Sequence, residues 1–132
     1  MSIVVDSSVL IAALVDVGPH GRWAEDVVAR GPLHAPQLAL AEVHNILRRL
    51  ERAKLITTPE ANGAQEDLMR LNINLYAFEP FADRSWQLRH SVTSYDAWYV
   101  ALAEALGLPL ATLDERLSES NVVACKFLKP RS

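Results

Sequence analysis

The sequence predicts an α/β fold, a three-layer α/β/α sandwich around a central, mostly parallel β-sheet. Short β-branched runs alternate with helical patterns along the chain, and no hairpin signal such as Asn-Gly joins two of these runs. Strands that are separated by helices pair in parallel in such folds, and the helices cover both faces of the sheet. Because the 132 residues contain neither an internal repeat nor a linker, we expect one domain over residues 1–132.

The chain as far as Ala53 contains two strands and three helices. They are expected at residues 3–5 (strand), 8–14 (helix), 22–30 (helix), 33–35 (strand) and from Pro36 to about Ala53 (helix). The run Ile3-Val4-Val5 favours a strand, and the serines that follow Asp6 can start a helix. Gly31-Pro32 stops the second helix, and an apolar stripe supports the third.

The remainder of the chain continues the alternation. We expect a helix that starts at the cap-like segment Thr57-Thr58-Pro59-Glu60 and runs to Leu71, and then a strand over 73–78. A helix that carries Phe81, Trp86 and Leu88 follows Glu79-Pro80. The last elements are a helix over 95–106, a strand over 110–113, a helical turn around 116–118 and a strand over 122–128. A Thr or Ser followed by Pro in the first turn is a helix-start signal. Thr93 or Ser94 can cap the 95–106 helix, and Gly107 ends it.

Composition and charge exclude several classes of protein. With 50% hydrophobic and 22% charged residues, the chain is globular rather than disordered. The formal net charge of −3 argues, taken alone, against a nucleic-acid-coating domain. Cys125 has neither a disulfide partner nor a nearby metal ligand, as expected in a reducing cytosol. Neither a signal peptide nor a membrane span is recognisable, so we expect a cytoplasmic protein.

Four acidic residues are expected to meet at one edge of the sheet. Asp6 and Asp114 follow short apolar strands, and ligands of open parallel sheets bind beyond the carboxyl ends of the strands. Asp96 lies in the first turn of its helix, whose N-terminus points to the same edge. Glu42 shares a helix face with Leu38 and Ile46, so it does not lie on a freely solvated face.

Each acid also has an ordinary structural explanation. An acid at a strand end often caps the next helix, and an acid in a first helical turn complements the helix dipole. Four carboxylates in one crevice, however, would repel one another unless a cation or protons neutralised them. Oxygen ligands without Cys or His favour Mg²⁺ or Mn²⁺, and such an ion activates water for phosphodiester hydrolysis.

Supporting residues are expected around these acids. Thr112 and Ser7 could hydrogen-bond a phosphate or a metal-bound water, although Ser7 equally suits helix capping. Arg116 is the best placed cation because it follows Asp114 by two residues. Other basic residues are usually solvated, and the tryptophans and tyrosines more often form core or dimer contacts than stack on bases. These further basic candidates are Arg48, Arg49, Arg52, Lys54, Arg84, Arg89 and His90.

Four segments resemble PIN domains, and most closely the VapC toxins of VapBC toxin–antitoxin pairs. The matching segments are Val4-Val5-Asp6-Ser7-Ser8, Ala41-Glu42-Val43-His44-Asn45-Ile46-Leu47, the run from Ser94 to Ala103 and the run from Ala111 to Leu117. The resemblance covers the chain from Ile3 to about Leu128. It implies a metal-dependent endoribonuclease whose acidic quartet, Asp6, Glu42, Asp96 and Asp114, binds Mg²⁺ or Mn²⁺. The chain departs from the family pattern at Glu115, where many relatives carry a basic residue.

The resemblance further implies partners and a cellular role. A VapC-type toxin cuts structured RNA, commonly tRNA or rRNA, and thereby inhibits translation. A cognate VapB-type antitoxin blocks the site, and the toxin typically forms a homodimer. The alternatives are a receiver-type Mg²⁺-binding signalling domain, a PIN nuclease of RNA processing that has no antitoxin, and a degenerate PIN domain. A receiver would need an acid beside Asp6 and an Asp after the strand of Tyr76, and both are absent.

Overall fold

The computed structural model describes residues 1–120 and 123–131, within which five strands form one parallel sheet in the order β3-β2-β1-β4-β5. The strands are β1 (Ile3–Val5), β2 (Leu33–Pro36), β3 (Ile73–Tyr76), β4 (Leu110–Ala111) and β5 (Phe127–Leu128). The helices are α1 (Ser7–Val15), α2 (Pro19–Arg30), α3 (Ala39–Arg52), α4 (Thr58–Arg70), α5 (Ala82–Gln87), α6 (Ser94–Leu106) and α7 (Glu115–Ser118), with a 3₁₀ turn η1 at Glu79–Phe81. This strand order differs from the order 2-1-3-4-5 of flavodoxin-like folds, to which receiver domains belong, and removes the receiver alternative.

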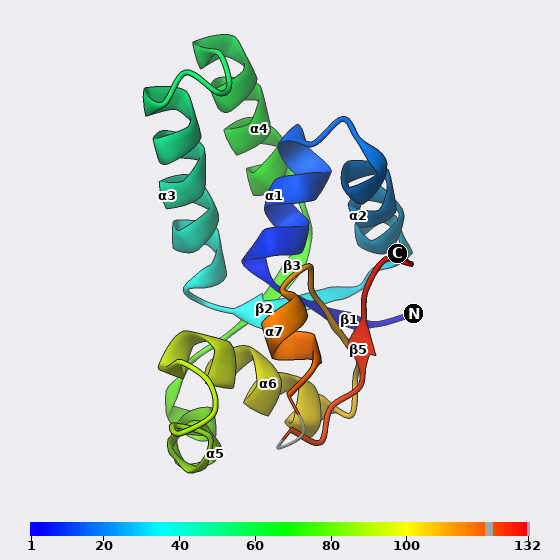
Figure 1. The fold of residues 1–132 in the computed structure, drawn as a ribbon, viewed down its shortest axis with the longest axis vertical. Helices are drawn as coiled ribbons and strands as arrows, with labels where there is room; N and C mark the ends of the chain where they lie inside the picture. Colours follow the sequence, from blue (N-terminus) through cyan, green and yellow to red (C-terminus); the bar gives the residue numbers. More distant parts are fainter. Residues whose placement is uncertain (121–122, 132) are drawn as a thin grey trace.

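Helices cover both faces of the sheet, which confirms the predicted three-layer sandwich. Figure 1 shows α1 to α4 on one side of the strands and α5 and α6 on the other. Successive residues of a strand point to opposite faces. Val5 and its partner Ala111 accordingly pack with α1–α4, whereas Val4 and its partner Leu110 pack with α6. The run Ile3-Val4-Val5 is uniformly apolar because β1 is buried on both faces.

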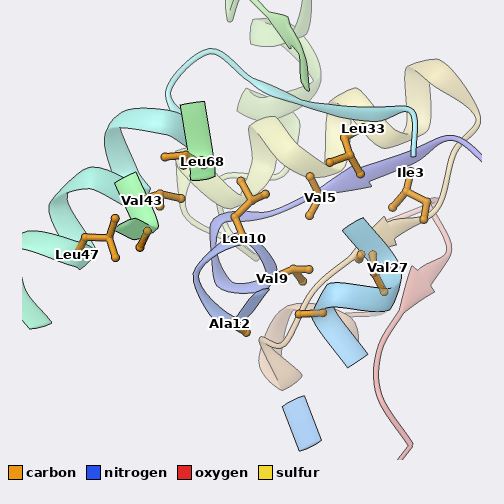
Figure 2. Packing of buried hydrophobic residues seen from close by; sticks show 13 residues of the cluster. Ile3, Val5, Val9, Leu10, Ala12, Val27, Leu33, Val43, Leu47 and Leu68 are labelled. Carbon is orange, nitrogen blue, oxygen red and sulfur yellow. The ribbon is translucent and has the colours of Figure 1, made fainter. Parts of the chain in front are cut away.

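The larger of the two cores lies between the sheet and α1–α4 (Figure 2). Val9 and Leu10 of α1 are fully buried at its centre, next to the sheet residues Ile3 and Val5. Leu68 brings α4 into the same core. Because α1 contacts α2, α3 and α4, it holds the helical layer together, and Asp6 stands directly at its N-terminus.

Most of the expected elements form, although several boundaries differ; the strand expected over 73–78, for example, ends at Tyr76. Pro36 does not open a helix but ends β2, where it pairs with Tyr76 of β3, and the N–H of the next residue, Gln37, donates to the Tyr76 carbonyl at 2.9 Å. The strand expected over 110–113 ends at Ala111. The last strand spans only Phe127–Leu128, and of the residues expected to begin it, Val122 lies outside the described part of the chain.

The segment that precedes β5 makes a hydrogen bond to α6. The N–H of Ala124 donates to the Glu104 carboxylate of α6 at 2.7 Å instead of pairing with a strand. Glu104 in turn accepts two hydrogen bonds from Arg84 of α5. The segment before β5 is therefore held by α6, and the sheet narrows at this edge.

No helix among the described residues is both long enough and apolar enough to cross a membrane.

Leu68 should contribute strongly to stability, whereas Leu55 should not. Leu68 is 1% exposed and Leu55 is 72% exposed. We expect Leu68→Ala to lower the free energy of unfolding by about 2–5 kcal/mol through the lost burial and the cavity left behind. The matched variant Leu55→Ala should change it by less than about 0.5 kcal/mol. Urea unfolding followed by circular dichroism measures both, and equal effects would contradict the proposed packing of α4.

Candidate active site

The four acids predicted from the sequence lie at the starts of four helices on the carboxyl-end side of the sheet. Asp6 is the N-cap of α1 and Asp114 is the N-cap of α7. Glu42 and Asp96 lie in the first turns of α3 and α6. Each acid therefore caps a helix or complements a helix dipole, because helix N-termini stabilise negative charge. Capping uses only part of a carboxylate, so it leaves a further role open.

Asp6 is the most deeply buried of the four, with 7% of its surface exposed. Its Oδ1 accepts hydrogen bonds from the N–H of Ser8 at 3.0 Å, the N–H of Val9 at 3.3 Å and the Ser8 hydroxyl. Burial raises the pKa of Asp6 to about 6, although hydrogen bonds from Ser8, Thr112 and Val9 act in the opposite direction. The hydrogen bonds therefore hold the Asp6 carboxylate in place, but they do not fully compensate the cost of burying its negative charge.

Two hydroxyl groups connect Asp6 to the segment that carries Asp114. The Ser8 hydroxyl, which donates to Asp6, accepts the N–H of Leu113 at 3.0 Å. The Thr112 hydroxyl accepts the N–H of Asp114 at 3.0 Å and is also hydrogen-bonded to Asp6. Thr112 is completely buried, so it orients the two acids from inside the protein. Thr112 was expected near the acids from its strand position, whereas the role of Ser8 was not anticipated.

Tyr99 anchors Glu42, whereas the sequence favoured a core or dimer contact for this residue. Its hydroxyl donates to Glu42 Oε1 at 2.6 Å, and Ser7 is hydrogen-bonded to the same hydroxyl. Burial first, and then the hydrogen bond to Glu42 and the charges of Glu42 and Asp6, raise the pKa of Tyr99 far above its usual range. Tyr99 thus remains a proton donor. A signal did exist, because Tyr99 follows Asp96 by three residues and so shares its helix face.

Glu42 and Asp96 carry charge that the protein compensates only in part. Burial raises the pKa of Glu42, the hydrogen bond from Tyr99 lowers it, and the charge of Asp96 raises it further. Burial also raises the pKa of Asp96, and the charge of Asp114 adds to the effect. A hydrogen bond to Thr93 and the charge of Arg116 act against these causes. Negative charge on Asp96 thus affects Glu42, and negative charge on Asp114 affects Asp96.

An open pocket of about 420 Å³ lies beside these acids. Its lining residues are Arg89, His90, Ser91, Val92, Thr93, Asp96, Asp114, Arg116 and Leu117. Arg116 is therefore placed as expected, next to Asp96 and Asp114. Glu115 is exposed and lies outside this lining.

The donor chemistry of the acidic site fits a hard divalent cation. All four candidate ligands are carboxylates, which Mg²⁺ and Mn²⁺ prefer, and their mutual repulsion would be relieved by positive charge. The side chains interact in pairs, Glu42 with Asp96 and Asp96 with Asp114. In the residues that the structure describes, no three acidic, His or Cys side chains lie together closely enough to hold an ion as they are oriented. The acids thus fit a divalent cation in the chemical type of their ligand atoms, but not in their present spacing.

Several basic candidates lie away from the pocket. Arg48 and Arg52 are exposed on α3, six and ten residues beyond Glu42, which corresponds to about 9–15 Å along the helix. Arg84 instead pairs with Glu104. His44 is exposed, and its Nδ1 lies 2.7 Å from the Leu40 carbonyl oxygen. Trp86, expected among the apolar residues of its helix, is 67% exposed and does not belong to the core.

Comparison with known proteins places this fold and site in a family. Residues 3–122 match the model of the PIN domain, and the chain belongs to the PIN domain family. It is 40% identical over 130 residues to ribonuclease VapC1 of Mycobacterium tuberculosis, covering 94% of each chain. It is 37% identical over 123 residues to a VapC ribonuclease of Mycobacterium bovis, covering 93% of this chain and 94% of the relative.

Solved structures agree on the fold. Mycobacterium tuberculosis VapC20, described as a sarcin-ricin loop cleaving toxin, superposes with a TM-score of 0.67 at 19% identity, covering 92% of this chain and 97% of that one. The VapBC2 complex of Rickettsia felis, bound to a DNA fragment from its promoter, gives a TM-score of 0.68 at 13% identity, covering 99% of this chain and 100% of that one. At these identities the likeness supports the α/β/α architecture alone.

Replacing Asp6 by Asn should stabilise the metal-free protein at neutral pH. The pKa of Asp6 is about 6 in the folded chain against 3.8 ordinarily, so its ionisation opposes folding. This cost is absent below about pH 4, grows up to about pH 6 and is constant above it, reaching about 3 kcal/mol. Asn keeps a capping oxygen and does not ionise. Urea unfolding in EDTA between pH 4 and pH 8 measures the difference.

The matched control is Asp26→Asn on α2, an exposed acid. It should change the free energy of unfolding by less than about 0.5 kcal/mol at every pH. If the advantage of Asp6→Asn over the wild-type chain stayed constant from pH 4 to pH 8, burial of the charged carboxylate would not be its cause.

Proposed function

We propose that this chain is the toxin of a VapBC-type toxin–antitoxin pair, a Mg²⁺- or Mn²⁺-dependent endoribonuclease that cleaves structured RNA and inhibits translation. One observation carries the proposal: a PIN-domain chain that is 37–40% identical to VapC ribonucleases places Asp6, Glu42, Asp96 and Asp114 at the N-termini of four helices on the carboxyl-end side of its sheet. The substrate class is tRNA or rRNA, and the protein acts as a single domain in the cytoplasm.

The residues divide into ligands and residues that position them. Asp6, Glu42, Asp96 and Asp114 would hold the ion, which when bound activates water and stabilises negative charge on the phosphate. Ser8 and Thr112 fix Asp6 and the backbone at Asp114, and Tyr99 fixes Glu42. These hydrogen bonds restrain Asp6, Glu42 and the backbone of Asp114, and the acids would have to turn toward one another to hold the ion.

RNA needs positive charge at the mouth of this acidic pocket. Arg116 and Arg89 supply it, because both line the pocket together with Asp96 and Asp114, and His90 adds a ring nitrogen there. Ser7 is hydrogen-bonded to Tyr99 and so supports Glu42. Binding of the ion removes part of the repulsion between the acids and the phosphates.

A VapB-type antitoxin is the proposed protein partner, and the toxin itself is proposed to form a homodimer. The structure neighbours include the VapBC2 complex of Rickettsia felis and FitAcB of Neisseria gonorrhoeae. An antitoxin would separate this protein from a PIN nuclease that serves RNA processing.

The purified protein should cleave RNA only with Mg²⁺ or Mn²⁺. We expect Asp6→Asn and Asp96→Asn each to reduce cleavage of total tRNA or rRNA by at least about 100-fold, because each removes a charged metal ligand. Asp67→Asn, an exposed acid on α4, is the matched control and should retain wild-type activity. Gel analysis of end-labelled RNA measures the rates. Cleavage that survives EDTA or either ligand variant would contradict the assignment.

Expression should arrest growth, and the neighbouring antitoxin gene should relieve the arrest. We expect translation, followed by radiolabelled methionine incorporation, to stop in cells that express the wild-type chain and to continue with Asp96→Asn. Coexpression of the antitoxin candidate should restore growth through a complex that copurifies with the toxin. Arrest without any such rescue would favour the RNA-processing alternative.

A further inference from the structure

Trp86 and Arg89 form an exposed aromatic–cation pair at the end of α5. Trp86 is 67% exposed, a high fraction for a large apolar side chain. The Arg89 guanidinium carbon lies 4.4 Å from the centre of the Trp86 ring, and its Nη1 donates to the Trp86 carbonyl at 2.9 Å. Arg89 is therefore held against the ring.

This pair stands at the rim of the acidic pocket. Arg89 lines the pocket together with His90, Arg116, Asp96 and Asp114. Helices α5 and α6 contact each other, and Figure 1 shows them side by side below the sheet. Arg89 takes part in none of the ion pairs found between side chains of residues 1–120 and 123–131. Its charge is thus available to a ligand at the pocket.

The chemistry of the pair suits a nucleobase attached to a phosphate. Aromatic rings and guanidinium planes both stack on bases, and base–aromatic stacking contributes roughly 1–3 kcal/mol per base. Arginine also donates to phosphate oxygens in a planar, two-pronged manner. The faces of a base inside a duplex are already covered by its neighbours. A base in a loop is splayed out and can reach such a platform.

We propose that Trp86 and Arg89 form a stacking platform for an unpaired base of the RNA, with Arg116 and His90 contacting its phosphates, so that the protein selects RNA loops over duplex. The inference deepens the proposed ribonuclease function and rests on it. A second copy of the chain or an antitoxin would also cover Trp86. The RNA is favoured because the cations beside the platform, Arg89 and Arg116, line the same pocket as Asp96 and Asp114.

Binding can be tested without cleavage. A fluorescent RNA hairpin with an unpaired loop and a blunt duplex of the same stem are titrated with the full-length protein in EDTA at low salt, and anisotropy is recorded. We expect Trp86→Ala to weaken hairpin binding about 5- to 100-fold and to leave duplex binding unchanged. Trp86→Phe should recover most of the hairpin affinity because it keeps a ring. Arg89→Lys should recover less than Trp86→Phe, because lysine keeps the charge but not the plane.

Matched controls separate the platform from general surface effects. Leu55→Ala removes another exposed apolar side chain, and Arg48→Ala removes an exposed cation remote from the pocket. Neither should change the ratio of hairpin to duplex affinity. An equal loss on both RNAs in Trp86→Ala, or no loss on either, would overturn the platform.

Two further readouts distinguish the other occupants and the underlying function. If Trp86→Ala instead turns a dimer into a monomer, or weakens only the complex with the antitoxin, at unchanged RNA affinity, the platform is wrong. With Mg²⁺ present, an Asp6-dependent cleavage that is as fast in Trp86→Ala as in the wild type would refute the platform alone. Hairpin selectivity that depends on Trp86, in a wild-type chain that cleaves no RNA, would refute the nuclease function and leave the platform standing.

Discussion

The arrangement of this site depends on one buried carboxylate at the end of the central strand. β1 is covered on both faces, so the residue that follows it emerges from the middle of the protein rather than from its surface. Asp6 occupies this position, and its Oδ1 accepts the hydrogen bonds that cap the N-terminus of α1. Because α1 contacts the other three helices of its layer, the same carboxylate that faces the site also starts the helix that organises the larger core. Fold and site share this residue.

Hydroxyl groups extend this constraint to the other acids. Ser8 and Thr112 each connect Asp6 to the loop between β4 and α7, and Tyr99 connects α6 to Glu42 on α3. These bonds satisfy polar groups that would otherwise be buried without partners. They also restrain Asp6, Glu42 and the backbone of Asp114, which belong to three separate helices. Burial first, and then the charge of a neighbouring acid, raises the pKa of both Glu42 and Asp96 in this arrangement.

The sequence was sufficient to predict the acids of the candidate site, but it was insufficient to predict the hydrogen bonds that hold them. Asp6, Asp114, Glu42 and Asp96 could be selected because parallel strands share one carboxyl edge, a rule that depends only on topology. Tyr99 was missed because a tyrosine on an apolar helix face looks like core until Glu42, 57 residues away, is brought to its hydroxyl. Pro36 was misplaced because proline ends a strand as readily as it starts a helix, and only the pairing with β3 decides between them.

Net charge was equally a poor guide to the binding surface. The chain carries 16 acidic and 13 basic residues, but the cations are not evenly distributed around the site. The arginines of α3 lie well beyond Glu42, and Arg84 is engaged with Glu104, whereas Arg89 and Arg116 line the pocket itself. A polyanion that approaches this face meets cations at the rim and carboxylates within. A cation bound to these carboxylates would lower the repulsion that a phosphate meets inside the pocket.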